Sequence, residues 1–122
     1  MKCSAILFLT SMLTISPASV FYAQPACKAP DLKQMVRDAR TTEDFAQLAI
    51  RFDQRAKEFE QSAQKEQKEL DRLHALLYHP RIYAIEVETT QNRLAYDKKQ
   101  ATTCSEFAVS YSAHAANPGV AP

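Results

Sequence analysis

The chain is short and almost neutral, with 122 residues and 15 lysines and arginines against 14 aspartates and glutamates. That length allows at most one domain. A nucleic-acid-binding protein normally carries a basic excess on one face, and an anionic membrane surface attracts basic segments, so this balance predicts neither partner. The sequence has a single glycine, which favours long uninterrupted helices over a fold with many turns.

Residues 1–23 have the pattern of an export signal. Lys2 precedes an apolar run at residues 5–15, and a stretch of mostly small residues follows the run. A positive start, an apolar stretch and a small-residue region in this order are typical of a secretory signal peptide. We expect cleavage after Ala18 or after Ala23, and therefore a protein that is exported to the periplasm or secreted.

Two alternatives to cleavage stay open at this point. No charged residue occurs from Cys3 to Cys27, so this stretch is long enough for an uncleaved membrane anchor. Attachment of a lipid to Cys27 is the second alternative, although the preceding residues lack the leucine of a usual lipoprotein signal. With cleavage, residues 24–116 are expected to form a helical hairpin domain and residues 117–122 a flexible tail.

A short helix is predicted over residues 31–39, followed by a much longer one. Pro30 stands where a first-turn proline is tolerated, and apolar residues recur at helical spacing after it. Thr41, with Asp44 three residues later, has the pattern of an N-cap with an acidic third helical residue. The second helix is therefore expected to begin directly after Thr41.

The second helix carries the strongest periodic pattern in the chain. Its apolar residues recur in alternating steps of three and four, interrupted by one glutamate, at Phe45, Ala49, Phe52, Ala56, Phe59, Ala63, Glu66, Leu70, Leu73 and Leu77. This heptad seam is typical of a helix that packs along its whole length against another helix. It predicts a helix of about 54 Å.

Residues 78–81 are predicted to form a turn, because Pro80 disfavours the helical conformation in the residue before it. The β-branched stretch at residues 82–90 is compatible with a strand, but a single strand has no partner in this chain, so a helix is expected. Two registers seven residues apart then continue to the end, at Val87, Leu94, Ala101, Ala108 and Ala115 and at Tyr83, Thr90, Asp97, Cys104 and Tyr111. The predicted fold is all-α, a long antiparallel helical hairpin with a short N-terminal helix folded back on it.

Two cysteines, Cys27 and Cys104, remain after the predicted cleavage. An even number of cysteines in an oxidising compartment favours a disulfide. Folding the two long helices together at the turn places Cys104 beside Ala56. Folding the first helix back at residues 40–41 brings Cys27 to the level of Arg55. Both foldings place the two thiols at one height, so we predict that a Cys27–Cys104 disulfide fastens the hairpin.

The reactive residue types do not form a recognisable catalytic or metal-binding pattern. Cys104 as a nucleophile would need an activating base, and His114 lies on nearly the opposite side of the same helix. Histidine ligands of a metal normally lie one or two turns apart on one face, and His74, His79 and His114 do not have this spacing. We expect no metal site and no cofactor.

Glu66 and Asp97 interrupt the two seams at facing levels. A pair of carboxylates is one arrangement for acid–base work, but a polar residue within a heptad seam more commonly fixes the register of the helices. We interpret the two residues as register positions and expect no enzymatic activity.

Two stretches of the sequence resemble segments of known proteins. They are residues 41–49, Thr-Thr-Glu-Asp-Phe-Ala-Gln-Leu-Ala, and residues 104–115, Cys-Ser-Glu-Phe-Ala-Val-Ser-Tyr-Ser-Ala-His-Ala. They are similar to segments of small exported, alanine-rich helical-hairpin proteins of bacteria, which are uncharacterised. In those proteins a capped long helix pairs with a later cysteine-bearing helix. The resemblance covers residues 31–116 and implies the same fold and compartment, and it implies nothing about activity.

The first functional hypothesis is an exported, non-enzymatic structural or protein-binding module. Two helices do not cover a seam on all sides, and a cluster of apolar residues lies near the turn, beyond the reach of the short first helix. We expect this tip to form a homodimer or to bind a protein partner. It comprises Leu70, Leu73, Leu76, Leu77, Tyr78, Ile82, Tyr83 and Ile85.

The alternative hypothesis is an exported stress or metal-responsive protein of the cell envelope, chaperone-like or a sensor. It is based on the three histidines and on a second helix with many glutamates and glutamines on its outer face, at Glu58, Glu60, Gln61, Gln64 and Gln67. Heat released on titration with zinc or copper would support this alternative.

Overall fold

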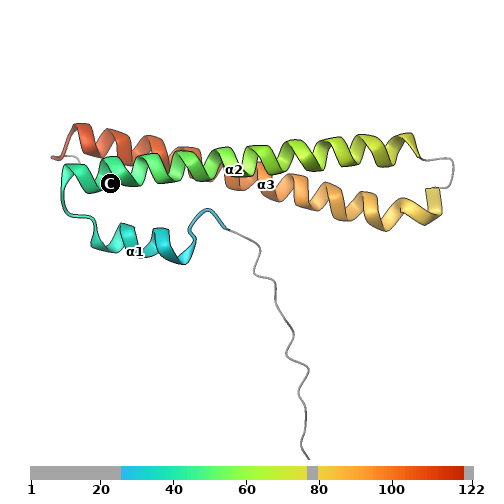
Figure 1. Ribbon diagram of the computed structural model, residues 1–122, viewed down its shortest axis with the longest axis horizontal. Helices are drawn as coiled ribbons and strands as arrows, with labels where there is room; N and C mark the ends of the chain where they lie inside the picture. The colour runs from blue at the N-terminus through green and yellow to red at the C-terminus, as the bar shows by residue number, and fades with distance from the viewer. Residues whose placement is uncertain (1–25, 77–79, 120–122) are drawn as a thin grey trace, which may run out of the picture.

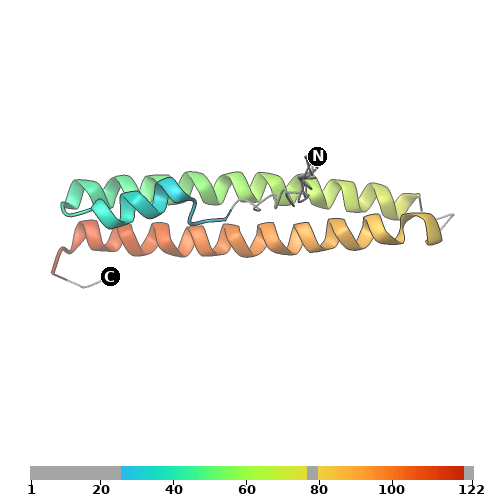
Figure 2. The ribbon, with the colours of Figure 1, turned by 90° about the horizontal axis from the view of Figure 1, so that it is seen from below.

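The computed structural model describes residues 26–76 and 80–119, which form three helices and no strand (Figure 1). α1 spans Pro30–Asp38, α2 spans Thr42–Ala75 and α3 spans Pro80–Ala116. α2 and α3 run side by side in opposite directions, and α1 lies along the hairpin at the end away from the turn (Figure 1 and Figure 2). The predicted fold class is confirmed, whereas the predicted signal peptide lies outside the described residues.

α1 is a short helix with both of its ends defined by the sequence. Pro30 occupies the first helical position, where a missing N–H leaves no hydrogen bond unmade. Asp31 in the first turn and Arg37 in the last turn have the charges that the helix dipole favours at each end. Beyond the helix, the Arg40 guanidinium donates to the carbonyl groups of Arg37 and Ala39, both at 2.7 Å. These bonds satisfy acceptors that the end of a helix leaves free.

α2 begins with the predicted cap. The Thr41 hydroxyl accepts a hydrogen bond from the Asp44 N–H at 3.1 Å, and the Asp44 carboxylate accepts from the Thr41 N–H at 2.8 Å. The Asp44 carboxylate also accepts from the Arg40 N–H at 2.9 Å. The hydrogen bonds from Arg40 and Thr41 lower the pKa of Asp44 below its ordinary value, because they favour the charged carboxylate.

The two seams that the sequence predicts form the interface between α2 and α3. In α2 the seam residues Phe52, Ala56, Phe59, Ala63, Leu70 and Leu73 are buried. In α3 the buried residues are Thr90, Leu94, Asp97, Ala101 and Cys104, all in the two predicted registers. Ring contacts join Phe52 to Phe107 and Phe45 to His114, two pairs whose residue numbers both sum to 159. This register is close to the predicted pairing of Cys104 with Ala56.

The boundary between the turn and α3 differs slightly from the prediction. Pro80 and Arg81 were expected within the turn, but α3 begins at Pro80. A proline disfavours helix in the residue before it, yet it fits the first position of the helix that follows. Tyr78 and His79 lie outside the described residues.

The β-branched stretch at the start of α3 is helical, as predicted. Val87 packs against a buried cluster formed by Ala63, Leu70 and Leu94, so packing outweighs the weak strand preference of this stretch. The hydroxyl of Thr89 donates to the carbonyl oxygen of Ile85 at 2.7 Å, a bond by which threonine is accommodated within helices.

The hydrophobic core is thick at one end of the hairpin and thin at the other. At the end covered by α1, side chains of all three helices form a large cluster with the aromatic rings of Phe45, Phe52, Phe107 and Tyr111. Toward the turn, a smaller cluster is formed by α2 and α3 alone. Apolar burial contributes about 25 cal/mol per Å², so most of the stability is expected at the covered end.

Candidate protein-binding surfaces

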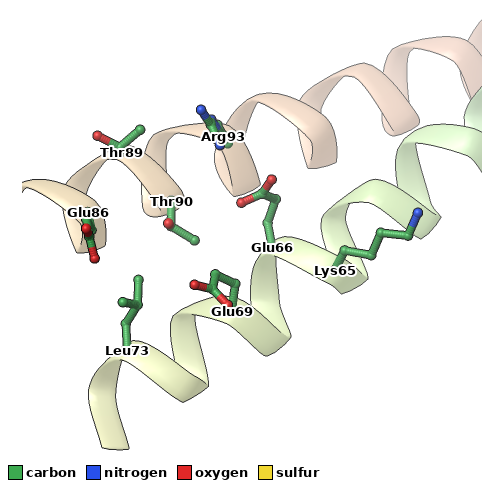
Figure 3. A pocket seen from close by; sticks show the side chains of 8 residues that line it. All are labelled: Lys65, Glu66, Glu69, Leu73, Glu86, Thr89, Thr90 and Arg93. Carbon is green, nitrogen blue, oxygen red and sulfur yellow. The ribbon is translucent and has the colours of Figure 1, made fainter. Parts of the chain in front are cut away.

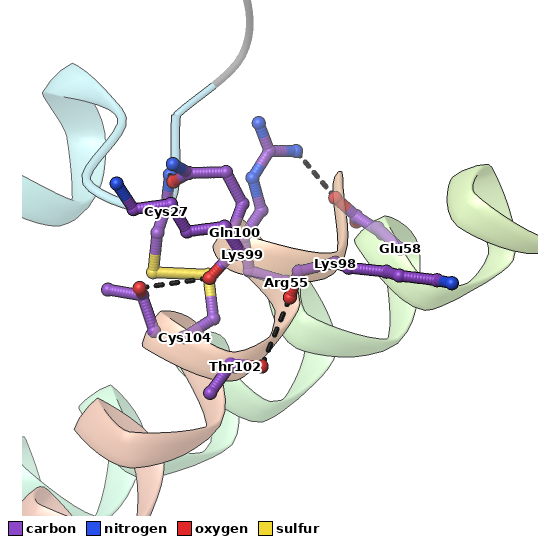
Figure 4. The surroundings of a disulfide bond; sticks show 9 residues. Cys27, Arg55, Glu58, Lys98, Lys99, Gln100, Thr102 and Cys104 are labelled. Carbon is purple, nitrogen blue, oxygen red and sulfur yellow. Dashed lines mark hydrogen bonds and ion pairs between the residues drawn. A yellow bond between two sulfur atoms is a disulfide. The ribbon is translucent and has the colours of Figure 1, made fainter. Parts of the chain in front are cut away.

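A disulfide joins Cys27, which precedes α1, to Cys104 in α3 (Figure 4). The two Cα atoms are 5.5 Å apart, the usual spacing across such a bond, and both residues are buried. The predicted disulfide is therefore confirmed. The Cys27 sulfur is bonded and is not free to carry a lipid, and Cys104 is not a free thiol nucleophile.

Further contacts attach the chain before α1 to α3. The Cys27 N–H donates to the side-chain oxygen of Gln100 at 2.8 Å, and the Lys28 ammonium lies 4.2 Å from the centre of the Phe107 ring, a cation–π contact. Arg55 of α2 lies near the disulfide, at the predicted level (Figure 4). α1 is thus held at both ends, by the disulfide before it and by the short link to α2 after it.

The predicted tip contains both buried and exposed side chains. Leu70 and Leu73 belong to the core between α2 and α3, and Leu73 is only 1% exposed. Leu76 is 41% exposed and Ile85 is 77% exposed, and Tyr83 is partly exposed. The part of the predicted tip that is exposed for contact with a partner is therefore limited to the end of α2 and the first two turns of α3.

The remaining tip residues are not placed by the structure. Leu77 and Tyr78 lie outside the described residues, and no side chain is described for Ile82. The burial of Leu73 also changes the choice of substitution for testing the tip. An aspartate there would be buried inside the hairpin, so exposed Ile85 is the suitable position.

A polar groove runs between α2 and α3 next to the tip (Figure 3). Glu66 and Arg93 project from facing helices, and Thr90 points from α3 toward α2 (Figure 3). Asp97, which we interpret with Glu66 as a register position, is buried and does not line this groove. The lining residues are Lys65, Glu66, Glu69, Leu73, Glu86, Thr89, Thr90 and Arg93.

The charges of this groove suit a polar contact surface. Three carboxylates stand with one ammonium and one guanidinium, and the hydrogen bond from Arg72 lowers the pKa of Glu69, which stays ionised. Polar and charged side chains are typical of the rim of a protein–protein interface.

The histidines of the described residues do not gather. His74 lies near the turn, and His114 lies at the other end of the hairpin, where its ring stands edge-on to Phe45 with centroids 4.2 Å apart. His79 lies outside the described residues. Among residues 26–76 and 80–119, no three His, Cys, Asp or Glu side chains are grouped so that they could hold a metal ion.

A second groove, which sequence reasoning missed, lies at the end away from the turn. It contains two exposed aliphatic side chains, Ile50 at 50% and Val109 at 67%. Both lie off the predicted seams and look isolated in the sequence. The register of the hairpin, however, brings them to the same level along the two helices. This shared level was the signal in the sequence that could have indicated the groove. The lining residues are Ala49, Ile50, Asp53, Ala108, Val109, Ser112, Ala113 and Ala116.

Comparison with protein-family models, with curated proteins and with solved structures finds no match for this chain. In the part of the chain that the structure describes, no helix combines the length and the apolar character that a membrane crossing requires.

Proposed function

We propose that this chain is an exported, non-enzymatic helical module that binds a protein partner through the turn end of its hairpin. The observation that carries the proposal is the exposure of Ile85, at 77%, on a helix whose Val87 and Leu94 pack inward against α2. Leu76, which directly follows α2, lies at nearly the same level and is 41% exposed. Apolar side chains exposed together beside a polar groove favour a protein interface.

The position of α1 supports a binding surface at the turn end of the hairpin. α1 covers the hairpin only at the end away from the turn, where the disulfide and the aromatic rings make a rigid base. A binding surface at the other end is then presented on two helices that the base holds in register. Sites placed on helices are held more firmly than sites on loops.

The proposed compartment is supported by two independent features. A buried disulfide is typical of proteins that fold in an oxidising environment, and the first 23 residues have the pattern of a secretory signal peptide. Because reduction would remove the bond that joins the chain before α1 to α3, the folded module is suited to a compartment in which the bond persists.

The proposal is tested by site-specific photo-crosslinking in the exporting host. A photoreactive amino acid replaces Ile85 in one variant and Ser110, exposed on α3 at the far end, in the matched control. We expect a discrete protein adduct from position 85 that is absent from position 110 and is reduced by Leu76→Asp. Adducts with the same partner protein in equal yield from both positions, or no adduct from position 85, would exclude a binding surface at the turn end.

A further inference from the structure

Ile50 and Val109 both lie on the face of the hairpin that α1 leaves uncovered. Leu48 lines the contact between α2 and α1, and Ile50 follows two residues later, about 200° around the helix. On α3, Cys104 is bonded to the chain before α1, and Val109 lies about 140° around from it. The two exposed side chains therefore point away from α1.

The two residues also share one level along the hairpin. Their numbers sum to 159, as do those of Phe52 and Phe107, which are in ring contact across the helices. Small side chains surround them and leave room for an aliphatic group from another molecule. The other lining residues are Ala49, Ala108, Ser112, Ala113 and Ala116, together with one carboxylate, Asp53.

We propose that this face binds a second copy of the chain about a two-fold axis that crosses both helices at the level of Ile50 and Val109. α2 then packs antiparallel on α2 of the second copy, and α3 packs antiparallel on α3. Residues on such an axis meet their own counterparts, so Ile50 contacts Ile50 and Val109 contacts Val109.

The charges on α2 complement each other in this register. An antiparallel pairing centred on Ile50 places Glu43 opposite Lys57 of the second copy, and the two-fold axis repeats the pair. Lys57 already forms an ion pair with Asp53 at 2.7 Å, which orients its ammonium group on the same stripe of the helix. Complementary charges at the edges of an apolar contact favour one partner and one orientation.

A different stacking, with α2 along α3 of the second copy, brings like charges together. With the register of the hairpin itself, that stacking places Asp53 opposite Glu106 and Asp71 opposite Glu88, all of them exposed. Facing carboxylates oppose association. The antiparallel stacking of α2 on α2 avoids both conflicts, because it places Asp53 opposite Gln47 of the second copy and its overlap ends before Asp71.

The size of the overlap suits a reversible dimer. The shared segment is about 24 Å long and about 20 Å wide, so the two copies bury roughly 1,000 Å² in total, the lower limit for a specific interface. The two turn ends then point in opposite directions, about 80 Å apart. If the turn end binds a partner, as proposed above, the dimer is bivalent, but the dimer itself does not depend on that function.

Sedimentation velocity on the purified, disulfide-bonded protein tests the interface. We expect the wild type to form dimers with a dissociation constant in the micromolar range, and Ile50→Asp and Val109→Asp to weaken it at least about 100-fold. Both substituted side chains are exposed, so circular dichroism should show unchanged helicity. Ile85→Asp is the matched control at the turn end and should leave the dimer intact. Glu43→Lys should weaken it roughly tenfold, and Glu43→Lys with Lys57→Glu should restore it.

Cysteine cross-linking tests the axis without adding a charge. Under mild oxidation, Val109→Cys should form a covalent dimer with itself, because residues on the axis come close enough for a disulfide, whereas Ser110→Cys should not. The α2-on-α3 stacking would instead join Val109→Cys to Ile50→Cys in a mixture of the two variants.

Three results would overturn the inference. The first is a wild-type protein that stays monomeric up to about 500 µM. The second is a dimer lost in Ile85→Asp but kept in Val109→Asp, which would place self-association at the turn end. The third is cross-linking only in the mixture of variants. The photo-crosslinking test of the turn end is independent of these three results.

Discussion

The bond between Cys27 and Cys104 joins residues 77 positions apart, and it is the main connection between the N-terminal segment and α3. Closing a loop of this length removes many conformations from the unfolded chain. Apart from this bond, α1 packs on the hairpin through buried Leu32 and a few half-buried neighbouring side chains. The disulfide is therefore expected to carry a large share of the stability of the covered end.

Replacing both cysteines, in Cys27→Ser with Cys104→Ser, should lower the free energy of unfolding by about 4 kcal/mol. α1 should lose its protection from hydrogen exchange first, because its attachment at one end is gone. Urea denaturation of the oxidised wild type and the double variant measures the difference, with exposed Ser110→Ala as the control. A loss below about 1 kcal/mol would mean that packing alone places α1.

At the start of α2, the cap predicts a specific dependence on pH. The pKa of Asp44 is lower in the folded protein than in the unfolded chain, so the carboxylate contributes stability above about pH 4 and loses this contribution as the pH falls through the folded value. The stability gap between wild type and Asp44→Asn should therefore close as the pH falls below about 4.

The same cap can be tested at neutral pH through its other partner. Thr41→Ala removes the hydroxyl that accepts from the Asp44 N–H and should cost about 1 kcal/mol. Thr42→Ala, one residue on and exposed, is the control. Equal urea midpoints for Thr41→Ala and wild type would show that the cap does not stabilise α2.

Of the three helices that the structure describes, α2 and α3 could be predicted from the sequence, because the buried positions of a long packed helix recur at a regular spacing. The registers through Phe59 and through Leu94 name most of the buried side chains of α2 and α3 before any fold is known, but they miss Leu48, which is 1% exposed. At the start of α3, the β-branched residues favour a strand. The helix could still be predicted there, because the chain offers no partner strand. The disulfide followed from the same register arithmetic.

The surfaces were less predictable than the core. The heptad seam already separates Leu73, which is buried, from Leu76, which is 41% exposed, but the predicted tip grouped both residues in one surface. Ile50 and Val109 resemble the scattered exposed apolar residues of any protein. Their shared level and face become visible only when the two helices and α1 are placed together.

The thin core near the turn makes a prediction for α2 and α3 as elements. Leu73→Asp buries a carboxylate against apolar side chains and should cost about 4 kcal/mol. The turn half of both helices should then lose its protection from hydrogen exchange, while the half with the disulfide stays protected. Leu76→Asp, at a more exposed position one turn away, is the control. Equal loss of protection along the hairpin would show that the two halves unfold as one unit.

At the scale of the whole molecule, the hairpin joins a rigid base to a weaker turn end. The base contains the disulfide, α1 and the aromatic rings, and the turn end has two helices and a small cluster. Regions that bind partners are commonly drawn from the less stable part of a fold. The proposed partner at the turn end and the proposed dimer at the base use different faces, so one molecule can carry both contacts.

The most direct test of the exported, disulfide-fastened hairpin is the intact mass of the protein recovered from its exporting host, before and after reduction with thiol alkylation. We predict a chain that begins at Ser19 or Gln24, is two hydrogen atoms lighter than its sequence, and takes up alkylating reagent only after reduction. A chain that retains residues 1–23, reacts as two free thiols without reduction, or carries a lipid on Cys27 would contradict it.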